Sequence, residues 1–233
     1  NDGWVDVFYN NLQNQTHALF RNAGGEYFDY MSPTTNVAAA SNDYSGWSTG
    51  FIDYDNDGWK DIYSANGDVD YLGENAAQHD TILRNLAGQA FEDVSTNLGT
   101  DFLHVGYQRG SAFADLNDDG FMDLVVTSLG ERPRILLNSA NNGHHWMLLD
   151  LQGHRSSRDA VGAMAKVTTA SGRVLYNHVS PSVGFMSTSD RRVHFGLGEE
   201  DAVATVEIRW PSGAIQELVA PEVDRVITIA EPR

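Results

Sequence analysis

Oxygen-bearing side chains in one short segment have the spacing of a calcium-binding loop. The segment Asp53-Tyr-Asp-Asn-Asp-Gly-Trp-Lys-Asp61 has aspartates at positions one, three, five and nine and a glycine at position six. A hard cation such as Ca2+ takes several oxygen ligands at about 2.3–2.6 Å, so the chain must curl tightly around one point. The glycine permits the positive φ of such a turn. The segment predicts a Ca2+ site whose ligands are Asp53, Asp55, Asp57, Asp61 and the backbone carbonyl of Trp59.

A second segment, Asp115-Leu-Asn-Asp-Asp-Gly-Phe-Met-Asp123, repeats this pattern. Its predicted ligands are Asp115, Asn117, Asp119, Asp123 and the backbone carbonyl of Phe121. The amide of Asn117 offers an oxygen without a negative charge, so we expect the loop at Asp53 to bind Ca2+ more tightly. The two segments therefore predict about two complete Ca2+ sites.

The chain also opens inside a third copy of the loop. Residues Asn1 to Asp6 match positions four to nine, and whether Asp2 and Asp6 complete a third site stays open. A single copy of such a sequence is also compatible with a solvated acidic turn, because Asp, Asn and Gly are common turn residues. Recurrence in register argues against that interpretation.

An EF-hand is the obvious alternative, because it shares the opening Asp-x-Asp-x-Asp-Gly. An EF-hand requires a bidentate glutamate at position twelve and a helix on each side. Position twelve is Ser64 in one loop and Val126 in the other, and both loops lead into β-prone runs. The EF-hand interpretation fails on both counts.

Other residues with possible chemistry have simpler explanations. Gly46-Trp-Ser-Thr-Gly50 matches the Gly-x-Ser-x-Gly nucleophile elbow, but that elbow needs a helix after it, and here a β-prone run follows. His144 and His145 are adjacent, so on a strand they point to opposite faces and do not share a metal. Asp68 and Asp70 could supplement a metal site or face a partner, although a solvated loop is the default. We predict no catalytic residue and no organic cofactor.

Internal repeats dominate the first 140 residues. The loops recur after 55 and 62 residues, counted from Asp2 to Asp57 and from Asp57 to Asp119. A segment with Arg-Asn followed by an aromatic recurs at residues 18–28 and 81–91, with a weaker echo at 134–138 and a polar insertion at Gly67–Asp80. About four short strands in each repeat predict β-propeller blades, of which this region holds about two and a half. We expect further blades upstream.

The pattern changes from about Asn141. Short strands then alternate with turns, including hairpins around Ala-Ser-Gly at 170–172 and Pro-Ser-Gly at 211–213. About seven strands predict a compact β-sandwich. The expected fold is all-β, with partial propeller blades over residues 1–140 and a sandwich domain over residues 141–233.

Composition excludes several classes of partner. The chain of 233 residues has a net charge of −17 and no cysteine. Nucleic acids and anionic membranes favour clustered Lys and Arg, so neither is an expected partner. No apolar stretch is long enough to span a membrane. The absence of cysteine excludes disulfides and leaves the redox compartment open.

Two families are recognisable in these patterns. The aspartate loops resemble FG-GAP/VCBS repeats, the calcium-binding blades of integrin-like propellers. The C-terminal hundred residues look like the ASPIC/UnbV domain, as seen at Gly143-His-His-Trp146, Ser157-Arg-Asp-Ala-Val-Gly-Ala163, Val193-His-Phe-Gly-Leu-Gly198 and Val206-Glu-Ile-Arg-Trp-Pro-Ser-Gly213. The family usually has Asn-Arg-Asp where this chain has Ser157-Arg-Asp159. The domain order is that of cartilage-acidic-protein-like secreted proteins.

The resemblance implies a secreted, cell-surface or periplasmic protein that contacts a protein or glycan surface and has no catalytic role. We therefore expect a calcium-stabilised binding, adhesion or assembly module. Two alternatives stay open at this point. One is a structural subunit of a filament or large complex, and the other is an accessory part of a propeller enzyme whose active site lies outside this chain.

Overall fold

The computed structural model describes residues 2–70 and 76–233. Within those residues, 17 strands form five sheets, with one short helix, α1 (Val37–Ser41), and one 3-10 turn, η1 (Ser95–Asn97). The predicted all-β fold class is confirmed. Asn1 of the partial first loop, and residues 71–75 of the predicted insertion, lie outside the described residues.

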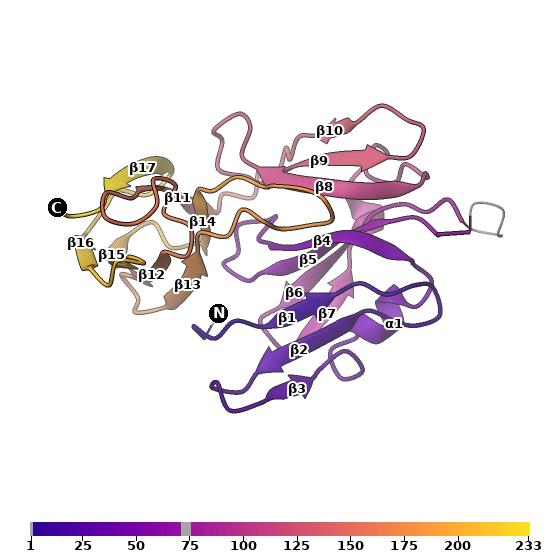
Figure 1. Ribbon diagram of the computed structural model, residues 1–233, viewed down its shortest axis with the longest axis horizontal. Helices are drawn as coiled ribbons and strands as arrows, with labels where there is room; N and C mark the ends of the chain where they lie inside the picture. The colour runs from indigo at the N-terminus through magenta and orange to yellow at the C-terminus, as the bar shows by residue number, and fades with distance from the viewer. Residues whose placement is uncertain (1, 71–75) are drawn as a thin grey trace.

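The first ten strands form three antiparallel sheets, which we call blades 1, 2 and 3. Their sheet orders are β1-β2-β3, β4-β5-β6-β7 and β10-β9-β8. Figure 1 shows the blades lying next to one another from the indigo to the pink part of the chain. The strands are β1 (Val7–Tyr9), β2 (Ala18–Asn22), β3 (Phe28–Tyr30), β4 (Gly46–Ile52), β5 (Asp61–Asn66), β6 (Thr81–Leu86), β7 (Ala90–Asp93), β8 (Gln108–Ala114), β9 (Asp123–Ser128) and β10 (Arg134–Leu136).

Blade 2 is buried on both faces because its apolar side chains alternate along the strands. Ile62, Leu83 and Phe91 pack toward blade 1, in a cluster with Leu19 and Val37. The opposite face packs toward blade 3 through a second cluster that includes Tyr63, Ala65, Ile82, Phe113, Leu124 and Val126. A strand buried on both faces explains why all six residues of β5 are buried.

The last seven strands form two sheets, ordered β14-β11-β17 and β13-β12-β15-β16, which we call the C-terminal sandwich. One core of 17 buried residues lies between them, including Leu149, Phe195 and Ile208. Strand β17 runs parallel to β11, which no hairpin signal in the sequence indicates. The strands are β11 (His145–Gln152), β12 (Met164–Thr169), β13 (Val174–His178), β14 (Val193–Gly198), β15 (Val203–Arg209), β16 (Ile215–Val219) and β17 (Arg225–Ala230).

Residues 179–192, which we call the crossing loop, leave the sandwich and pass between blades 2 and 3. Figure 1 shows this orange segment running from β13 and β14 toward β4 and β8. The Phe185 amide donates to Ser48 Oγ of β4 at 3.0 Å, and the Asp190 amide donates to the Phe113 carbonyl of β8 at 2.9 Å. The crossing loop therefore joins the C-terminal sandwich to blades 2 and 3 through direct contacts.

Glu231 fixes the end of β17 against a loop of the sandwich. Its Oε2 accepts hydrogen bonds from three successive amides, those of His154, Arg155 and Ser156, each at 2.7 Å. Its Oε1 accepts from the hydroxyls of Ser156 and Ser212. Burial raises the pKa of Glu231, but these hydrogen bonds outweigh burial and lower it to about 2.

We predict that Glu231→Gln lowers the melting temperature, and that this effect depends on pH. A carboxyl with a lowered pKa contributes stability above its unfolded value, here 4.5, and loses it as the pH falls through about 2. Thermal melts from pH 7 to pH 2 measure the difference between variant and wild type, which should shrink below about pH 4.5. The exposed Glu217 supplies the control, Glu217→Gln. A difference that stays constant over this range would contradict the assignment.

Candidate metal centre

The aspartate loops share one backbone conformation, in which the glycine at position six has a positive φ. Its value is +85° at Gly58, +89° at Gly120 and +91° at Gly3. Position four is left-handed as well, with φ of 58° at Asn56 and 57° at Asp118. Asn and Asp tolerate the left-handed region near +57°, whereas the larger φ at position six favours glycine, so the glycine has the role that the sequence predicts for it.

Three of the four carboxylates predicted in the first loop meet at one point. Asp53, Asp55 and Asp61 each place a carboxylate oxygen within 4.8 Å of the others. Asp53 and Asp61 are buried, with exposed fractions of 1% and 0%. Oδ2 of Asp53 accepts from the Gly58 amide at 2.9 Å, whereas its buried Oδ1 has no hydrogen-bond partner. A buried carboxylate oxygen without a donor fits a cation as its missing partner.

The electrostatics of the first loop favour a cation. Burial, together with the neighbouring charges of Asp53 and Asp55, raises the pKa of Asp61 to about 9. Burial also raises the pKa of Asp53 to about 7, although the ammonium group of Lys60 lowers it. These shifts mean that the loop resists holding its negative charges together without compensation. Ca2+ would supply that compensation.

Asp57, the fourth predicted carboxylate of the first loop, is not part of this group of three, and the backbone carbonyl of Trp59 stays a predicted ligand. The Oδ1 atom of Asp57 accepts from the Trp59 amide at 2.7 Å. The Trp59 ring lies 5.6 Å from the guanidinium carbon of Arg173, which belongs to the C-terminal sandwich. Trp59 therefore packs across to the sandwich.

In the second loop, the oxygens of Asp115 and Asp123 all accept hydrogen bonds from backbone amides. Oδ1 and Oδ2 of Asp115 accept from the amides of Asp119 and Gly120, and the oxygens of Asp123 accept from those of Leu116 and Asn138. In the part of the chain that the structure describes, the group around Asp53 is the one that meets the 4.8 Å spacing.

The side chains of Asn117 and Asp119, two further predicted ligands of the second loop, also bond to each other or to the backbone. Asn117 donates through Nδ2 to Asp119 Oδ2 at 2.8 Å, and the Phe121 amide donates to Asp119 Oδ1 at 2.9 Å. The occupancy of this loop by Ca2+ stays a prediction.

The aspartate at position nine has a second role, which the loop pattern alone does not reveal. In each blade its carboxylate accepts a hydrogen bond from the backbone amide of the asparagine in the repeated segment that follows the loop. The distances are 2.8 Å for Asn22 to Asp6, 2.8 Å for Asn85 to Asp61 and 2.7 Å for Asn138 to Asp123. The repeated Arg-Asn segment in the sequence was the available signal for this contact.

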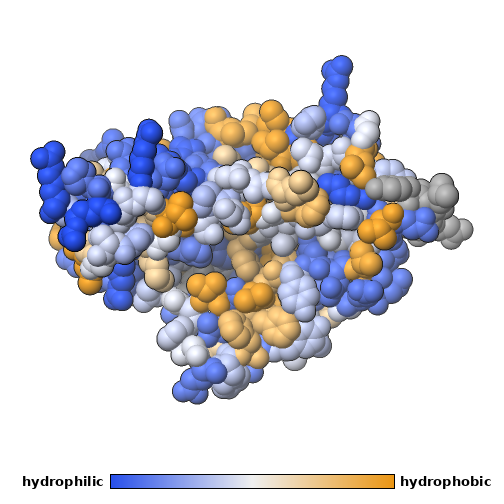
Figure 2. All heavy atoms as spheres, in the orientation of Figure 1, coloured by the Kyte–Doolittle hydropathy of each residue, from blue (hydrophilic) through white to orange (hydrophobic). Residues whose placement is uncertain are grey.

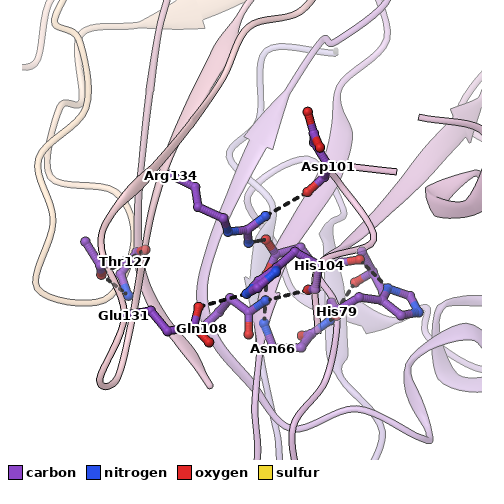
Figure 3. Close-up of polar contacts among 11 residues, drawn as sticks. Asn66, His79, Asp101, His104, Gln108, Thr127, Glu131 and Arg134 are labelled. Carbon is purple, nitrogen blue, oxygen red and sulfur yellow. Dashed lines mark hydrogen bonds and ion pairs between the residues drawn. The ribbon is translucent and has the colours of Figure 1, made fainter. Parts of the chain in front are cut away.

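A buried ion pair joins blades 2 and 3 away from the loops. Arg134 of β10 donates to Asp80 Oδ2 at 3.1 Å and to the Asp101 carbonyl at 2.8 Å. Figure 3 shows Arg134 pointing toward Asp101, with Asn66 and His104 nearby. Burial raises the pKa of Asp80 to about 6, although the charge of Arg134 lowers it. Asp80, which the sequence placed in a polar insertion, is thus a core residue.

The remaining candidates for chemistry have structural partners. Ser48 lies within β4, and its Oγ accepts from the Ser111 hydroxyl at 2.7 Å, so it is not at a strand-to-helix elbow. His144 donates through Nδ1 to the Asp55 carbonyl, whereas Nδ1 of His145 contacts Asp224. The adjacent histidines thus have separate partners. The Asp68 carboxylate accepts hydrogen bonds from the nearby amides of Val69 and Asp70.

Comparison with known proteins agrees with this architecture. The family model described as "FG-GAP-like repeat" matches residues 1–64, and the model described as "ASPIC and UnbV" matches residues 153–233. The chain therefore carries an FG-GAP-like repeat followed by an ASPIC and UnbV domain, which confirms the resemblance.

Curated relatives match along the whole chain. Cartilage acidic protein 1 of Homo sapiens is 24% identical over 247 residues, covering 100% of this chain and 35% of the relative. The protein of the same name from Mus musculus is 24% identical, covering 100% of this chain and 36% of the relative. That from Xenopus tropicalis is 24% identical, covering 99% and 35%. The chain spans about a third of the length of these relatives.

We predict that Arg134→Met lowers the free energy of unfolding by about 3–5 kcal/mol, because it leaves the Asp80 carboxylate buried and unpaired. Chemical denaturation measures this loss. A matched control is Arg84→Met, which breaks the more exposed pair with Glu92 and should cost less than about 1 kcal/mol. Equal losses in the two variants would show that the pair of Arg134 and Asp80 contributes no more to the free energy of unfolding than an exposed pair does.

Proposed function

We propose that this chain, which joins an FG-GAP-like repeat to an ASPIC and UnbV domain, is a calcium-stabilised, non-catalytic binding or assembly module of an extracytoplasmic protein. The observation that carries the proposal is the group of Asp53, Asp55 and Asp61, with one buried carboxylate oxygen left without a donor. The name of the relatives, Cartilage acidic protein 1, supports an extracellular setting. Among the described residues, no helix has the length and apolar character needed to cross a membrane.

Calcium would act on stability through the turn between β4 and β5. Asp53 directly follows β4 and Asp61 begins β5, so an ion bound by both would tie the two strands together. It would also offset the repulsion among the carboxylates that burial strengthens. Binding to the folded chain alone adds directly to the free energy of unfolding.

We predict that Ca2+ raises the melting temperature of the chain relative to a chelator. At a free Ca2+ concentration 100 times the dissociation constant, one site contributes about 2.7 kcal/mol. Thermal melts with Ca2+ and with EGTA measure this, and Mg2+ at the same concentration controls for ionic strength. Identical melts in Ca2+ and EGTA would remove the proposal.

The two loops can be ranked by exchanging the charge at position three. Asp55→Asn should weaken the tighter site, and Asn117→Asp should strengthen the weaker one, because carboxylate count tunes affinity. Ca2+ titration of both variants by calorimetry measures the two dissociation constants. Opposite changes would contradict the ranking, and they would leave the melting result unaffected.

Blade 1 carries a surface that supports assembly. Val7, Phe20 and Phe28 stand at the repeat positions of Ile62, Leu83 and Phe91, which in blade 2 are buried against blade 1. On blade 1, Val7 is 43% and Phe28 is 51% exposed. Figure 2 shows apolar side chains gathered over this blade in the lower part of the view. We call Val7, Tyr9, Phe20, Phe28 and Tyr30 the open blade face.

The occupant that fits the open blade face is another blade of the same kind. Blade 2 already provides the matching arrangement, because its equivalent residues pack against a neighbouring blade. Contiguous apolar surface of this type marks an interaction site in soluble proteins. The chain spans about a third of its relatives' length, which is compatible with further blades elsewhere in a longer protein.

We predict that the chain associates through the open blade face in a concentration-dependent manner. Sedimentation velocity should show that Val7→Ser combined with Phe28→Ser is monomeric at concentrations where the wild type associates. Ile215→Ser, at an exposed position of β16, is the control and should behave as wild type. A wild type that stays monomeric at all concentrations would argue against an accessible docking face.

A further inference from the structure

The outer surface of the Asp53 loop is held by residues from the C-terminal part of the chain. The Asp55 carbonyl accepts from Asn142 Nδ2 at 2.5 Å and from His144 Nδ1 at 2.7 Å. The next carbonyl, that of Asn56, accepts from the Gly198 amide at 2.8 Å. Three successive carbonyls of the loop are bound in this way, because that of Asp57 accepts from Arg173 Nη1 at 2.9 Å.

Strand β14 approaches the same loop so closely that only glycine fits. A Cβ atom added at Gly196 would lie 2.3 Å from Asp53 Oδ2 and 2.5 Å from the Cα of Asn56. Such distances are far inside van der Waals contact, so either the strand or the loop would have to move. The carboxylate of Asp53 is therefore positioned from outside by the sandwich and from inside by its own loop.

Further contacts join this interface to the second loop. The Gly120 carbonyl accepts from Asn56 Nδ2 at 3.2 Å and lies 3.0 Å from Nε2 of His194, a residue of β14. Lys60 donates through Nζ to the His194 carbonyl at 3.4 Å. Both aspartate loops thus meet β14 at one place.

We propose that the Asp53 loop is a calcium-dependent clamp between blade 2 and the C-terminal sandwich. The inference rests on the proposed function, because it takes this loop as a Ca2+ site. Residues 53–57 contribute carboxylates on one side and sandwich-bound carbonyls on the other. A change in loop conformation on loss of the ion therefore changes both sets of contacts.

Thermodynamic linkage makes the coupling between Ca2+ binding and the contact of the loop with the sandwich reciprocal. If Ca2+ strengthens the contact between the loop and the sandwich, then the contact strengthens Ca2+ binding by the same factor. Residues such as Arg173, Asn142 and Gly196 would then set the Ca2+ affinity without being ligands. The state of the ion would in turn control how firmly the sandwich is attached to the blades.

The first test changes a clamp residue and measures Ca2+ affinity. Arg173→Met removes the donor to the Asp57 carbonyl and keeps an apolar side chain near Trp59. Calorimetric titration of the whole chain should give a dissociation constant about fivefold or more above that of the wild type. Arg209→Met is the matched control, because Arg209 is an exposed arginine of β15 in the same sandwich, paired with Glu207, and should leave the affinity unchanged.

A second variant covers the case in which Arg173→Met does not fold. Asn142→Ala removes one donor to the Asp55 carbonyl from a segment outside the sheets, and we expect a weaker affinity there too. Gly196→Ala, which inserts a Cβ against Asp53, should have the largest effect. Unchanged affinity in folded Arg173→Met and Asn142→Ala would overturn the clamp.

Hydrogen exchange of the wild-type chain measures the opposite effect, that of Ca2+ on the contact between the loop and the sandwich. The Gly198 amide, which donates to the Asn56 carbonyl, should exchange faster in EGTA than in Ca2+. Amides of the β12–β15 ladder inside the sandwich should not change. Equal exchange at Gly198 despite Ca2+ binding would overturn the clamp alone. A wild type that binds no Ca2+ would overturn the proposed function as well.

Discussion

The structure depends on one unfavourable arrangement, the burial of like charges at the turn between β4 and β5. Carboxylates removed from water and placed within a few ångströms of one another repel strongly, because the surrounding dielectric is low. Asp53 and Asp61 are nevertheless almost fully buried. The amides of Gly58, Tyr54 and Asn85 donate hydrogen bonds to these carboxylates and stabilise part of their charge. A hard cation is the simplest group that satisfies the rest.

The sequence contained much of this arrangement because tight aspartate-rich turns impose strict local rules. The positions of the glycines and aspartates predicted the loop conformation, and alternating apolar residues predicted the strands of both regions. The Asp53 group could be anticipated from spacing alone. The sequence predicted that the two loops differ in charge at position three. The structure adds a difference that no local pattern encodes, because Asp115 Oδ1 accepts from the Asp119 amide, whereas the equivalent Oδ1 of Asp53 has no hydrogen-bond partner.

What the sequence could not predict are contacts between residues far apart along the chain. The parallel pairing of β17 with β11, the burial of Asp80 against Arg134 and the hydrogen bonds from Asn142 and Arg173 to the Asp53 loop belong to this class. Each depends on how sheets pack, and side-chain packing across sheets leaves no fixed spacing in the sequence. The two halves of the molecule therefore looked more independent in sequence than they are in structure.

The crossing loop has a consequence for how the chain folds. Ser48 and Phe185 are 137 residues apart in sequence, and Phe185 occupies its place only when β4 and β8 are already side by side. Contacts of such long range carry a large loop-closure cost before they contribute stability, and they slow folding. The connection between β13 and β14 thus depends on contacts with β4 and β8 for its native position.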